Sequence, residues 1–230
     1  MIRARFPHLL WLAALLMLPF ASRAADSARA EGFTRLPQGA VVALMPLDVE
    51  LFSISAGGVL EPQAEWTARA HENLRQAFLA RKSALDVDFR PVEDDGDPRI
   101  ENLNRLHGAV GDAITLHRRG NYALPTKEGK LDWSLGEEAA AIREKTGADF
   151  ALFSYVRDSY ASGERVAAIV IGALLGVGMS GGAQVGYASL VDLSTGNIVW
   201  FNRLARASGD LRDPEKARES AQALLADFPD

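Results

Sequence analysis

The stretch SLGEEAAAIREKTGADFALFSYV, residues 134–156, predicts the architecture of this chain. Ser134 and Glu137 have the S-x-x-E spacing of a helical capping box, and Gly147 is typical of the residue that ends a helix. Phe150 to Val156 follows at once and is apolar on both faces, as expected of a central strand that is covered on both sides. A helix that leads directly into such a strand favours an α/β fold.

Hydrophobic periodicity and turn residues predict the other elements. We expect strands at 41–52, 85–92, 150–156, 184–193 and 198–204, and helices at 61–83, 100–118, 134–147 and 213–227. Pro46 should cause a bulge, an edge or an early end in the first strand, and Pro62 suits the first turn of the first helix. Gly196 suits the turn of a β-hairpin, and Asp213 suits the N-cap of the last helix. The sequence therefore predicts a single α/β domain over 39–230, with a mixed β-sheet of about five strands flanked by helices and a C-terminal β-hairpin followed by a helix.

The first 24 residues have the pattern of a secretory signal peptide. Arg3 and Arg5 precede the apolar run Leu9 to Phe20, which is too short to span a bilayer. Small residues at Ser22 and Ala24 predict cleavage before Ala25. We expect residues 25–38 to be a flexible lead and the protein to be periplasmic.

Composition excludes several classes of function. Removing residues 1–24, which contain three arginines and no acidic residue, changes the formal net charge from −5 to −8, so nucleic acid is not an expected partner. The chain has no cysteine. It therefore has no disulfide, no lipid-attachment cysteine, no thiol nucleophile and no cysteine-bound metal.

The segment GALLGVGMSGGAQVGY, Gly172 to Tyr187, matches three motifs. The G-x-G-x-x-G match at 176–181 lacks room for the helix that a dinucleotide site needs, because strand-like residues follow. The G-x-S-x-G match at 178–182 would make Ser180 a nucleophile, but all three histidines of the mature chain precede it, whereas α/β-hydrolases place theirs afterwards. Histidine-first order is that of trypsin-like proteases, yet Met179 stands where their serine motif has an acid.

The third match, G-x-x-x-G at 172–176, belongs to a longer apolar segment. Residues 166–191 carry no charge over 26 positions, which is long enough to span a membrane, but six of them are glycine. The most apolar part, 166–179, is equally typical of a buried helix or strand, and we expect it to be shielded by its own chain. The alternative is a membrane-associated oligomer that uses residues 166–191. The candidate interaction or oligomer residues are Gly172, Gly176, Gly178, Gly181, Gly182 and Trp200.

No other constellation predicts chemistry. The acidic residues at 93–97 lack calcium-loop spacing and favour a solvated turn. His71, His107 and His117 are too far apart to share a metal, and we expect them at the surface or at helix ends. Trp200 is expected in the core or as an interaction anchor. We expect no cofactor, no metal and no catalytic residue.

Two stretches resemble known envelope proteins. EEAAAIREKTGADFALF and AQVGYASLVDLSTGNIVW are similar to bacterial envelope proteins of the curli-assembly lipoprotein type, to the penicillin-binding-protein activator lipoproteins and to the amino-terminal domain of the Tol-system translocation protein. The matching positions are Gly147 to Asp149 and Val191 to Trp200. The resemblance implies an α/β domain used for protein–protein contact and oligomerisation, without catalysis. This chain departs from it in lacking the lipidated cysteine and in having one uncharged segment, where the curli pore uses two membrane hairpins.

These observations predict a periplasmic, non-enzymatic protein-binding or assembly module of the bacterial cell envelope. Its partner would be an envelope protein or another copy of itself. Two alternatives stay open at this point: the membrane-associated oligomer that uses residues 166–191, and a serine hydrolase that uses Ser180.

Overall fold

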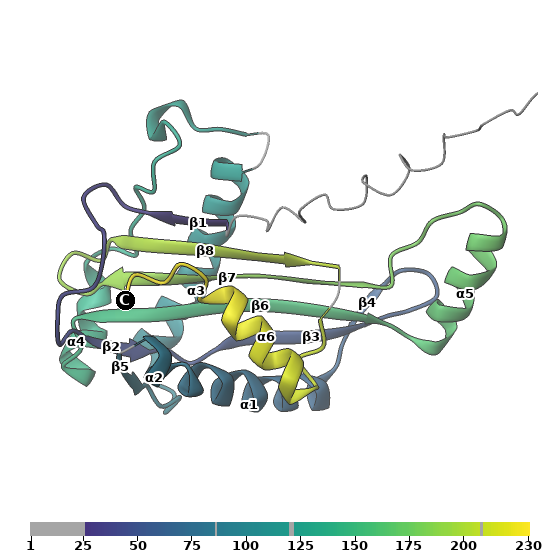
Figure 1. Cartoon of the computed structure of the whole chain (residues 1–230), viewed down its shortest axis with the longest axis horizontal. Coiled ribbons are helices and arrows are strands. Elements are labelled where there is room, and N and C mark those ends of the chain that lie inside the picture. The colour runs from purple at the N-terminus through teal and green to yellow at the C-terminus, as the bar shows by residue number, and fades with distance from the viewer. Residues whose placement is uncertain (1–25, 86, 120–121, 208) are drawn as a thin grey trace, which may run out of the picture.

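The computed structural model describes residues 26–85, 87–119, 122–207 and 209–230 (Figure 1). The signal-peptide prediction lies outside the described residues. The strands are β1 (Asp26–Arg29), β2 (Val41–Leu44), β3 (Asp48–Ile54), β4 (Leu60–Pro62), β5 (Asp88–Pro91), β6 (Phe150–Ala161), β7 (Gly182–Asp192) and β8 (Ile198–Arg206). The helices are α1 (Ala64–Ala80), α2 (Lys82–Leu85), α3 (Pro98–Ile114), α4 (Ala140–Thr146), α5 (Gly163–Leu174) and α6 (Pro214–Leu224).

The strands form one open mixed sheet in the order β1-β8-β7-β6-β2-β5. Strands β6, β7, β8 and β1 are antiparallel neighbours, whereas β2 pairs in parallel with β6 and β5. Strand β3 also pairs in parallel with β6, further along it, and forms an antiparallel pair with β4. The fold is therefore the predicted single α/β domain with a mixed sheet, which has eight strands where about five were expected.

Strand β6 lies at the centre of the sheet, as its apolar sequence predicts. Phe150, Leu152 and Val156 point into a core that α1 and α6 cover. Ala151 and Phe153 point into the opposite core, under α3 and α4. Because successive side chains of a strand alternate between faces, a strand that is buried on both sides must be apolar at nearly every position.

Two features of the N-terminal half correct the sequence prediction. Residues 26–29, expected in a flexible lead, form β1 along the edge of β8. The single strand expected at 41–52 is two strands, β2 and β3, because the chain leaves the sheet at Pro46, which has no N–H to donate to a neighbouring strand. The two pieces pair with successive parts of β6.

Two predicted helix starts were wrong. Ser134 does not cap a helix, because its hydroxyl donates to the Gly196 carbonyl at 2.9 Å and accepts from the Gly136 N–H at 2.9 Å. A 3₁₀ turn at Glu137–Ala139 then precedes α4. Pro62 ends β4 instead of starting α1, whose N-cap is Gln63.

Three predicted chain reversals and caps are confirmed. Gly147 ends α4 with a φ of 67°, and Gly196 has a φ of 73° in the turn between β7 and β8. Asp213 caps α6 by accepting from the N–H groups of Glu215 and Lys216. All three depend on local backbone geometry, which the sequence encodes directly.

Candidate interaction surface

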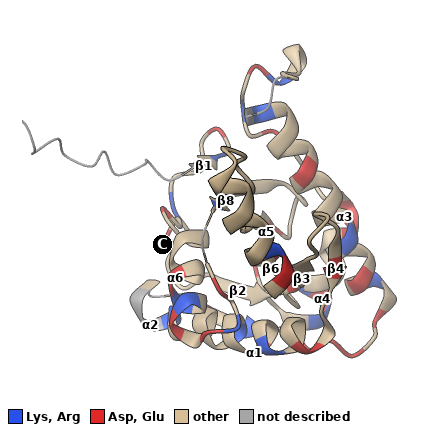
Figure 2. Ribbon diagram, turned by 90° about the vertical axis from the view of Figure 1, so that its right-hand side faces the viewer, with Lys and Arg blue, Asp and Glu red and all other residues tan. Residues whose placement is uncertain are grey.

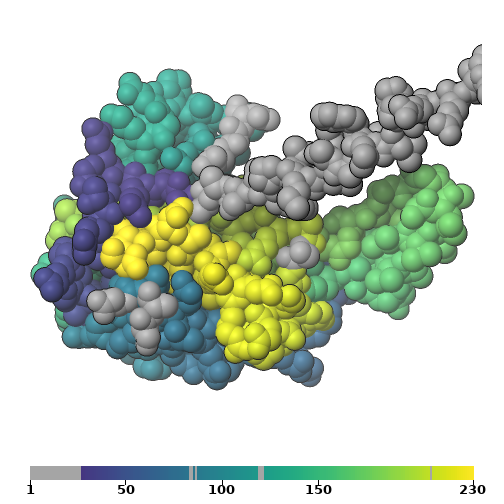
Figure 3. Space-filling view, in the orientation of Figure 1, coloured from purple at the N-terminus to yellow at the C-terminus, as the bar shows by residue number. Residues whose placement is uncertain are grey.

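The candidate surface is a hairpin-like projection between β6 and β7, residues 162–181, which we refer to as the α5 arm. It contains α5 and the chain that returns from it to β7. Figure 1 shows the α5 arm beyond the end of the sheet, away from α1, α3, α4 and α6. In the space-filling view it projects from the body at the opposite end from β1 (Figure 3).

The outer face of α5 is apolar and exposed. Leu174 is 83% exposed and Leu175 is 75% exposed, and Val166, Val170, Ile171 and Val177 are each more than half exposed. Together they expose on the order of 700 Å², whereas the largest apolar patch on a typical monomer is about 300–600 Å². Figure 2 shows that α5 carries almost no charged residue. An apolar helix face of this size is typical of an interaction surface.

The expectation that residues 166–179 are shielded by their own chain is therefore wrong. The only buried residue of α5 is Gly172. The segment is apolar enough for a core, but it is placed at a chain reversal past the ends of β6 and β7, where no described helix or strand covers the outer face of α5. Apolar composition left helix and strand equally open for this segment. In the structure α5 forms as far as Leu174, and its outer side is uncovered.

The glycines of the segment serve the reversal of the α5 arm itself. A Cβ at Gly172 would lie 2.5 Å from Cε of Met179 and 3.2 Å from the carbonyl oxygen of Val177, so glycine at this position lets the return chain pack closely against α5. Gly176 has a φ of 75°, which turns the chain after the helix. Gly178 and Gly181 are exposed on the return chain, and Gly182 begins β7. Whether these five glycines contact a partner stays a prediction.

Two residues fix the base of the α5 arm to the body. The N–H of Ser162 donates to the carbonyl of Ile54 in β3 at 3.0 Å, and its hydroxyl caps α5 by accepting from the N–H of Arg165 at 3.2 Å. The Arg165 guanidinium donates to the Ser180 carbonyl at 3.3 Å through two nitrogens, and to the Ala56 carbonyl at 3.2 Å. These bonds join both chains of the α5 arm to the turn between β3 and β4.

Ser180 has no catalytic partner in the part of the chain that the structure describes. Its hydroxyl donates to the carbonyl of Gly182 at 3.2 Å and accepts from the N–H of the same residue at 3.3 Å. His107 is buried in α3, where its Nε2 lies 2.9 Å from the hydroxyl of Ser189. The structure thus brings no histidine to Ser180, and a strand, β7, follows the G-x-G-x-x-G motif where a dinucleotide site needs a helix.

Histidine and tryptophan positions were only partly predictable. His107, expected at the surface or at a helix end, is 1% exposed and stacks on Phe153 with ring centroids 4.8 Å apart. Burial lowers the pKa of His107 to about 3. Trp200 is fully buried in the core under α6, so it is absent from the surface of the single chain.

A buried polar cluster that sequence reasoning missed fastens the segment before α6 to the sheet. The Asp158 carboxylate, 2% exposed, accepts from Nε2 of Gln184 at 2.9 Å, from the hydroxyl of Tyr160 and from the N–H of Leu211. The hydroxyl of Ser220 donates to Oε1 of Gln184 at 2.8 Å. Burial raises the pKa of the Asp158 carboxyl above its usual range. Since other protein groups donate to the carboxylate of Asp158 and to Oε1 of Gln184, the cluster acts as a structural clamp. Its only signal in the sequence was an Asp and a Gln on neighbouring strands.

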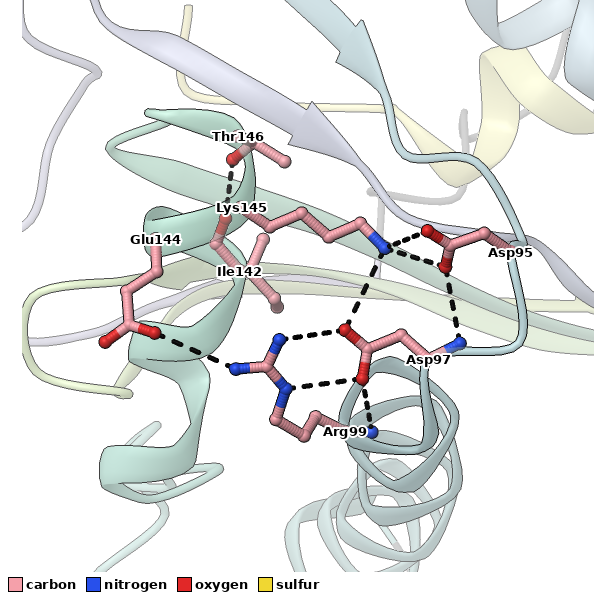
Figure 4. Close-up of polar contacts among 7 residues, drawn as sticks. All are labelled: Asp95, Asp97, Arg99, Ile142, Glu144, Lys145 and Thr146. Carbon is pink, nitrogen blue, oxygen red and sulfur yellow. Dashed lines mark hydrogen bonds and ion pairs between the residues drawn. The ribbon is translucent and has the colours of Figure 1, made fainter.

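The acidic turn at 93–97 is used for ion pairing (Figure 4). Asp95 accepts from Nζ of Lys145 on α4 through both carboxylate oxygens at 2.7 Å. Asp97 caps α3 and pairs with Arg99 at 2.9 Å. These hydrogen bonds, from Lys145 and from Arg99 respectively, lower the pKa of Asp95 and Asp97 below the usual range. Within the described ranges, no group of three or more His, Asp or Glu residues has an arrangement that could hold a metal ion.

A search of the described residues for membrane spans found no helix with the length and apolarity that crossing a bilayer requires. Helix α5 has 12 residues, well short of the roughly 20 that a spanning helix needs.

Comparison with known proteins gives a distant likeness in fold. No protein-family model and no curated protein matches the sequence. Among solved structures, a PelC dodecamer from Paraburkholderia phytofirmans is 12% identical and has a TM-score of 0.44, with 90% of this chain and 96% of that chain covered. The LpoB C-terminal domain from Salmonella enterica is 17% identical with a TM-score of 0.31, covering 77% of this chain and 87% of that chain.

A third solved structure is lipoprotein GNA1162 from Neisseria meningitidis, 12% identical with a TM-score of 0.32, covering 74% of this chain and 81% of that chain. At these TM-scores the likeness concerns the general α/β fold, and nothing about binding or assembly is transferred from it.

Proposed function

We propose that this protein is a periplasmic, non-enzymatic protein-binding or assembly module of the bacterial cell envelope, and that the α5 arm is its contact element. The observation that carries the proposal is the exposed apolar outer face of α5 on an arm whose base is fixed by Arg165. A rigid apolar projection lowers its free energy by docking against another apolar surface, and it loses little conformational entropy when it does so.

The N-terminal sequence and the polar contacts support the same proposal. The signal-peptide pattern directs the chain out of the cytoplasm, where a cysteine-free fold is unaffected by an oxidising compartment. The polar side chains that sequence analysis singled out are occupied: Ser180 by the backbone of Gly182, His107 by Ser189 and Asp95 by Lys145. Each of these contacts holds the fold together without needing a substrate.

Site-specific photo-crosslinking in envelope extract tests this function. A photoreactive amino acid at Ile171, on the outer face of α5, should capture a protein partner. The matched control is the same amino acid at the exposed residue Glu72 of α1, which should capture none. Equal crosslinking from both positions would contradict the role of the α5 arm, and turnover of a substrate by the purified protein alone would contradict the non-enzymatic function.

The same exposed face also favours a second candidate, the membrane-associated oligomer that uses residues 166–191. In that case α5 would lie in the headgroup region of the bilayer with its apolar face toward the acyl chains. Flotation with vesicles of phosphatidylethanolamine and phosphatidylglycerol separates the two candidates. Co-flotation that Leu174→Glu abolishes would favour the membrane, and free protein at the bottom of the gradient would favour a protein partner.

A further inference from the structure

A second apolar surface lies between α3 and α4 and has the right size for the tip of the α5 arm. This α3–α4 groove has a volume of about 370 Å³. Its apolar lining is Leu103 and Leu106 of α3 and Ala140 and Ala141 of α4. Its polar and charged lining is Arg99, Asn102, Glu137, Glu138 and Glu144. Leu106 is 40% exposed, so the groove presents an accessible apolar side chain.

The tip of the α5 arm offers matching side chains. Leu174, Leu175 and Val177 are exposed at the reversal of the arm. At the close-packed density of protein interiors, 370 Å³ takes roughly three aliphatic side chains. The three aliphatic side chains of the tip therefore match the volume of the groove, and they match its leucine and alanine side chains in chemistry.

The α5 arm cannot reach the groove of its own chain. Helix α4 ends just before the first residue of β6, whereas α5 begins just after its last residue. Strand β6 has 12 residues, a length of roughly 40 Å at 3.3 Å per residue. Figure 1 shows α4 and α5 at opposite ends of the long axis, so only a second molecule can bring the two surfaces together.

We propose that the apolar tip of the α5 arm of one molecule docks in the α3–α4 groove of a second copy of this chain. The proposal rests on the proposed role of the α5 arm as contact element and names its partner. Because two different patches meet, the interface is head-to-tail and repeats from molecule to molecule, which gives a ring or a filament depending on the rotation between copies.

Charge and area favour a second copy over a lipid surface. Helices that lie on anionic membranes carry Lys and Arg on their polar face. The one basic residue of α5, Arg165, is bonded to the carbonyls of Ser180 and Ala56. The chain without residues 1–24 is also net negative. With the tip in the groove and the rest of the outer face of α5 against the second copy, the interface would bury on the order of 700 Å² of the α5 arm, close to the ~800 Å² that each partner buries in a stable interface.

Complementary charge variants test the interface. Leu174→Glu places a charge on the α5 arm and leaves the groove intact, and Leu106→Glu does the reverse. Both residues are exposed in the single chain, so both variants should fold, which circular dichroism verifies. Leu116→Glu is the matched control, because Leu116 is an exposed leucine outside both surfaces. Sedimentation velocity of the mature chain over a range of concentrations gives the assembly state.

The expected result is specific to a head-to-tail contact. The unmodified chain and Leu116→Glu should self-associate. The dissociation constant of self-association should be roughly tenfold or more higher for Leu174→Glu and for Leu106→Glu, as expected when a central interface side chain is changed. An equimolar mixture of Leu174→Glu and Leu106→Glu should form a 1:1 dimer and nothing larger, because one intact arm and one intact groove remain. Since the chain has no cysteine, Leu174→Cys and Leu106→Cys should form a disulfide-linked pair when mixed and oxidised.

Other outcomes overturn the inference in distinguishable ways. Association that Leu174→Glu abolishes but Leu106→Glu leaves intact would mean that two arms pair with each other. A monomer that floats with vesicles of phosphatidylethanolamine and phosphatidylglycerol, or that crosslinks through Ile171 to a different envelope protein, would refute the second copy and keep the α5 arm as contact element. If Leu174→Glu changes none of these measurements, the proposed function fails together with the inference.

Discussion

Lowering the pH from about 7.5 to about 5 should remove stability that the buried side chain of His107 contributes to the fold. The imidazole is 1% exposed, stacks on Phe153 and lies 5.4 Å from the ring of Tyr187, centroid to centroid. Its Nε2 lies 2.9 Å from the hydroxyl of Ser189. No counter-ion contributes to its environment, and burial lowers the pKa of His107 from 6.5 to about 3. The folded chain therefore keeps the ring neutral where the unfolded chain protonates it.

The sign and magnitude follow from that difference. Below pH 6.5 the unfolded state binds one more proton than the folded state, so the free energy of unfolding falls as the pH falls toward 3. Integrated from about pH 7.5 to about pH 5, the loss is about 2 kcal/mol. Both pH values lie well above the pKa of His107 in the folded state, so the size of the loss depends almost entirely on the pKa of His107 in the unfolded state. Carboxylates whose pKa is lowered, such as Asp97, contribute at lower pH.

Urea unfolding followed by tryptophan fluorescence measures the effect, with His107→Gln as the comparison. Glutamine is a good helix former and retains a hydrogen-bonding group toward Ser189, but it does not titrate. The variant is expected to be less stable at neutral pH, because glutamine fills the aromatic site poorly. Between about pH 7.5 and about pH 5, the free energy of unfolding of His107→Gln should fall by about 2 kcal/mol less than that of the unmodified chain. Identical pH dependence in the two proteins would refute the placement of a neutral histidine in the core.

Three further predictions follow from packing and hydrogen bonding. Gly111→Ala should destabilise the fold by about 1–3 kcal/mol in urea unfolding, because the new Cβ would lie 2.0 Å from Cε2 of the buried Tyr187. The control is Gly108→Ala, three residues earlier in α3, where the new Cβ would lie 3.8 Å from the nearest side-chain atom, so this change should be neutral or stabilising. Equal losses of stability in the two variants would contradict this packing. Asp158→Ala should cost about 2–4 kcal/mol by leaving buried donors unpaired, and a midpoint within error of the unmodified chain would contradict the clamp. Arg165→Ala should speed limited proteolysis within 162–181 without changing the unfolding midpoint of the body, and unchanged cleavage would mean that its hydrogen bonds do not hold the α5 arm.

Local sequence determined much of the fold. The apolar residues on both faces of Phe150–Val156 predicted a central strand covered on both sides, and the structure confirms it as the first part of β6. Gly196 and Asp213 predicted a hairpin turn and a helix start at the residues where they occur. These features depend on interactions within a few residues, or on a pattern that holds whichever element provides the cover.

Contacts between distant segments decided the rest. Ser134 has the pattern of a helix cap, but the turn at Gly196 approaches it and takes its hydroxyl as a hydrogen-bond partner. Residues 26–29 look like a lead, yet the free edge of β8 provides a place for them to pair. His107 is neutral only because Phe153 and Tyr187 from two central strands enclose it.

The candidate surface shows the same division most clearly. By itself the sequence determined that residues 166–179 are uncharged and apolar, which sets their preference for an environment away from water. Only the tertiary structure decided that this environment is not supplied by the chain, because β6 and β7 carry the segment past the edge of both helical layers. Hydrophobicity is a property of the residues, whereas burial is a property of what packs against them.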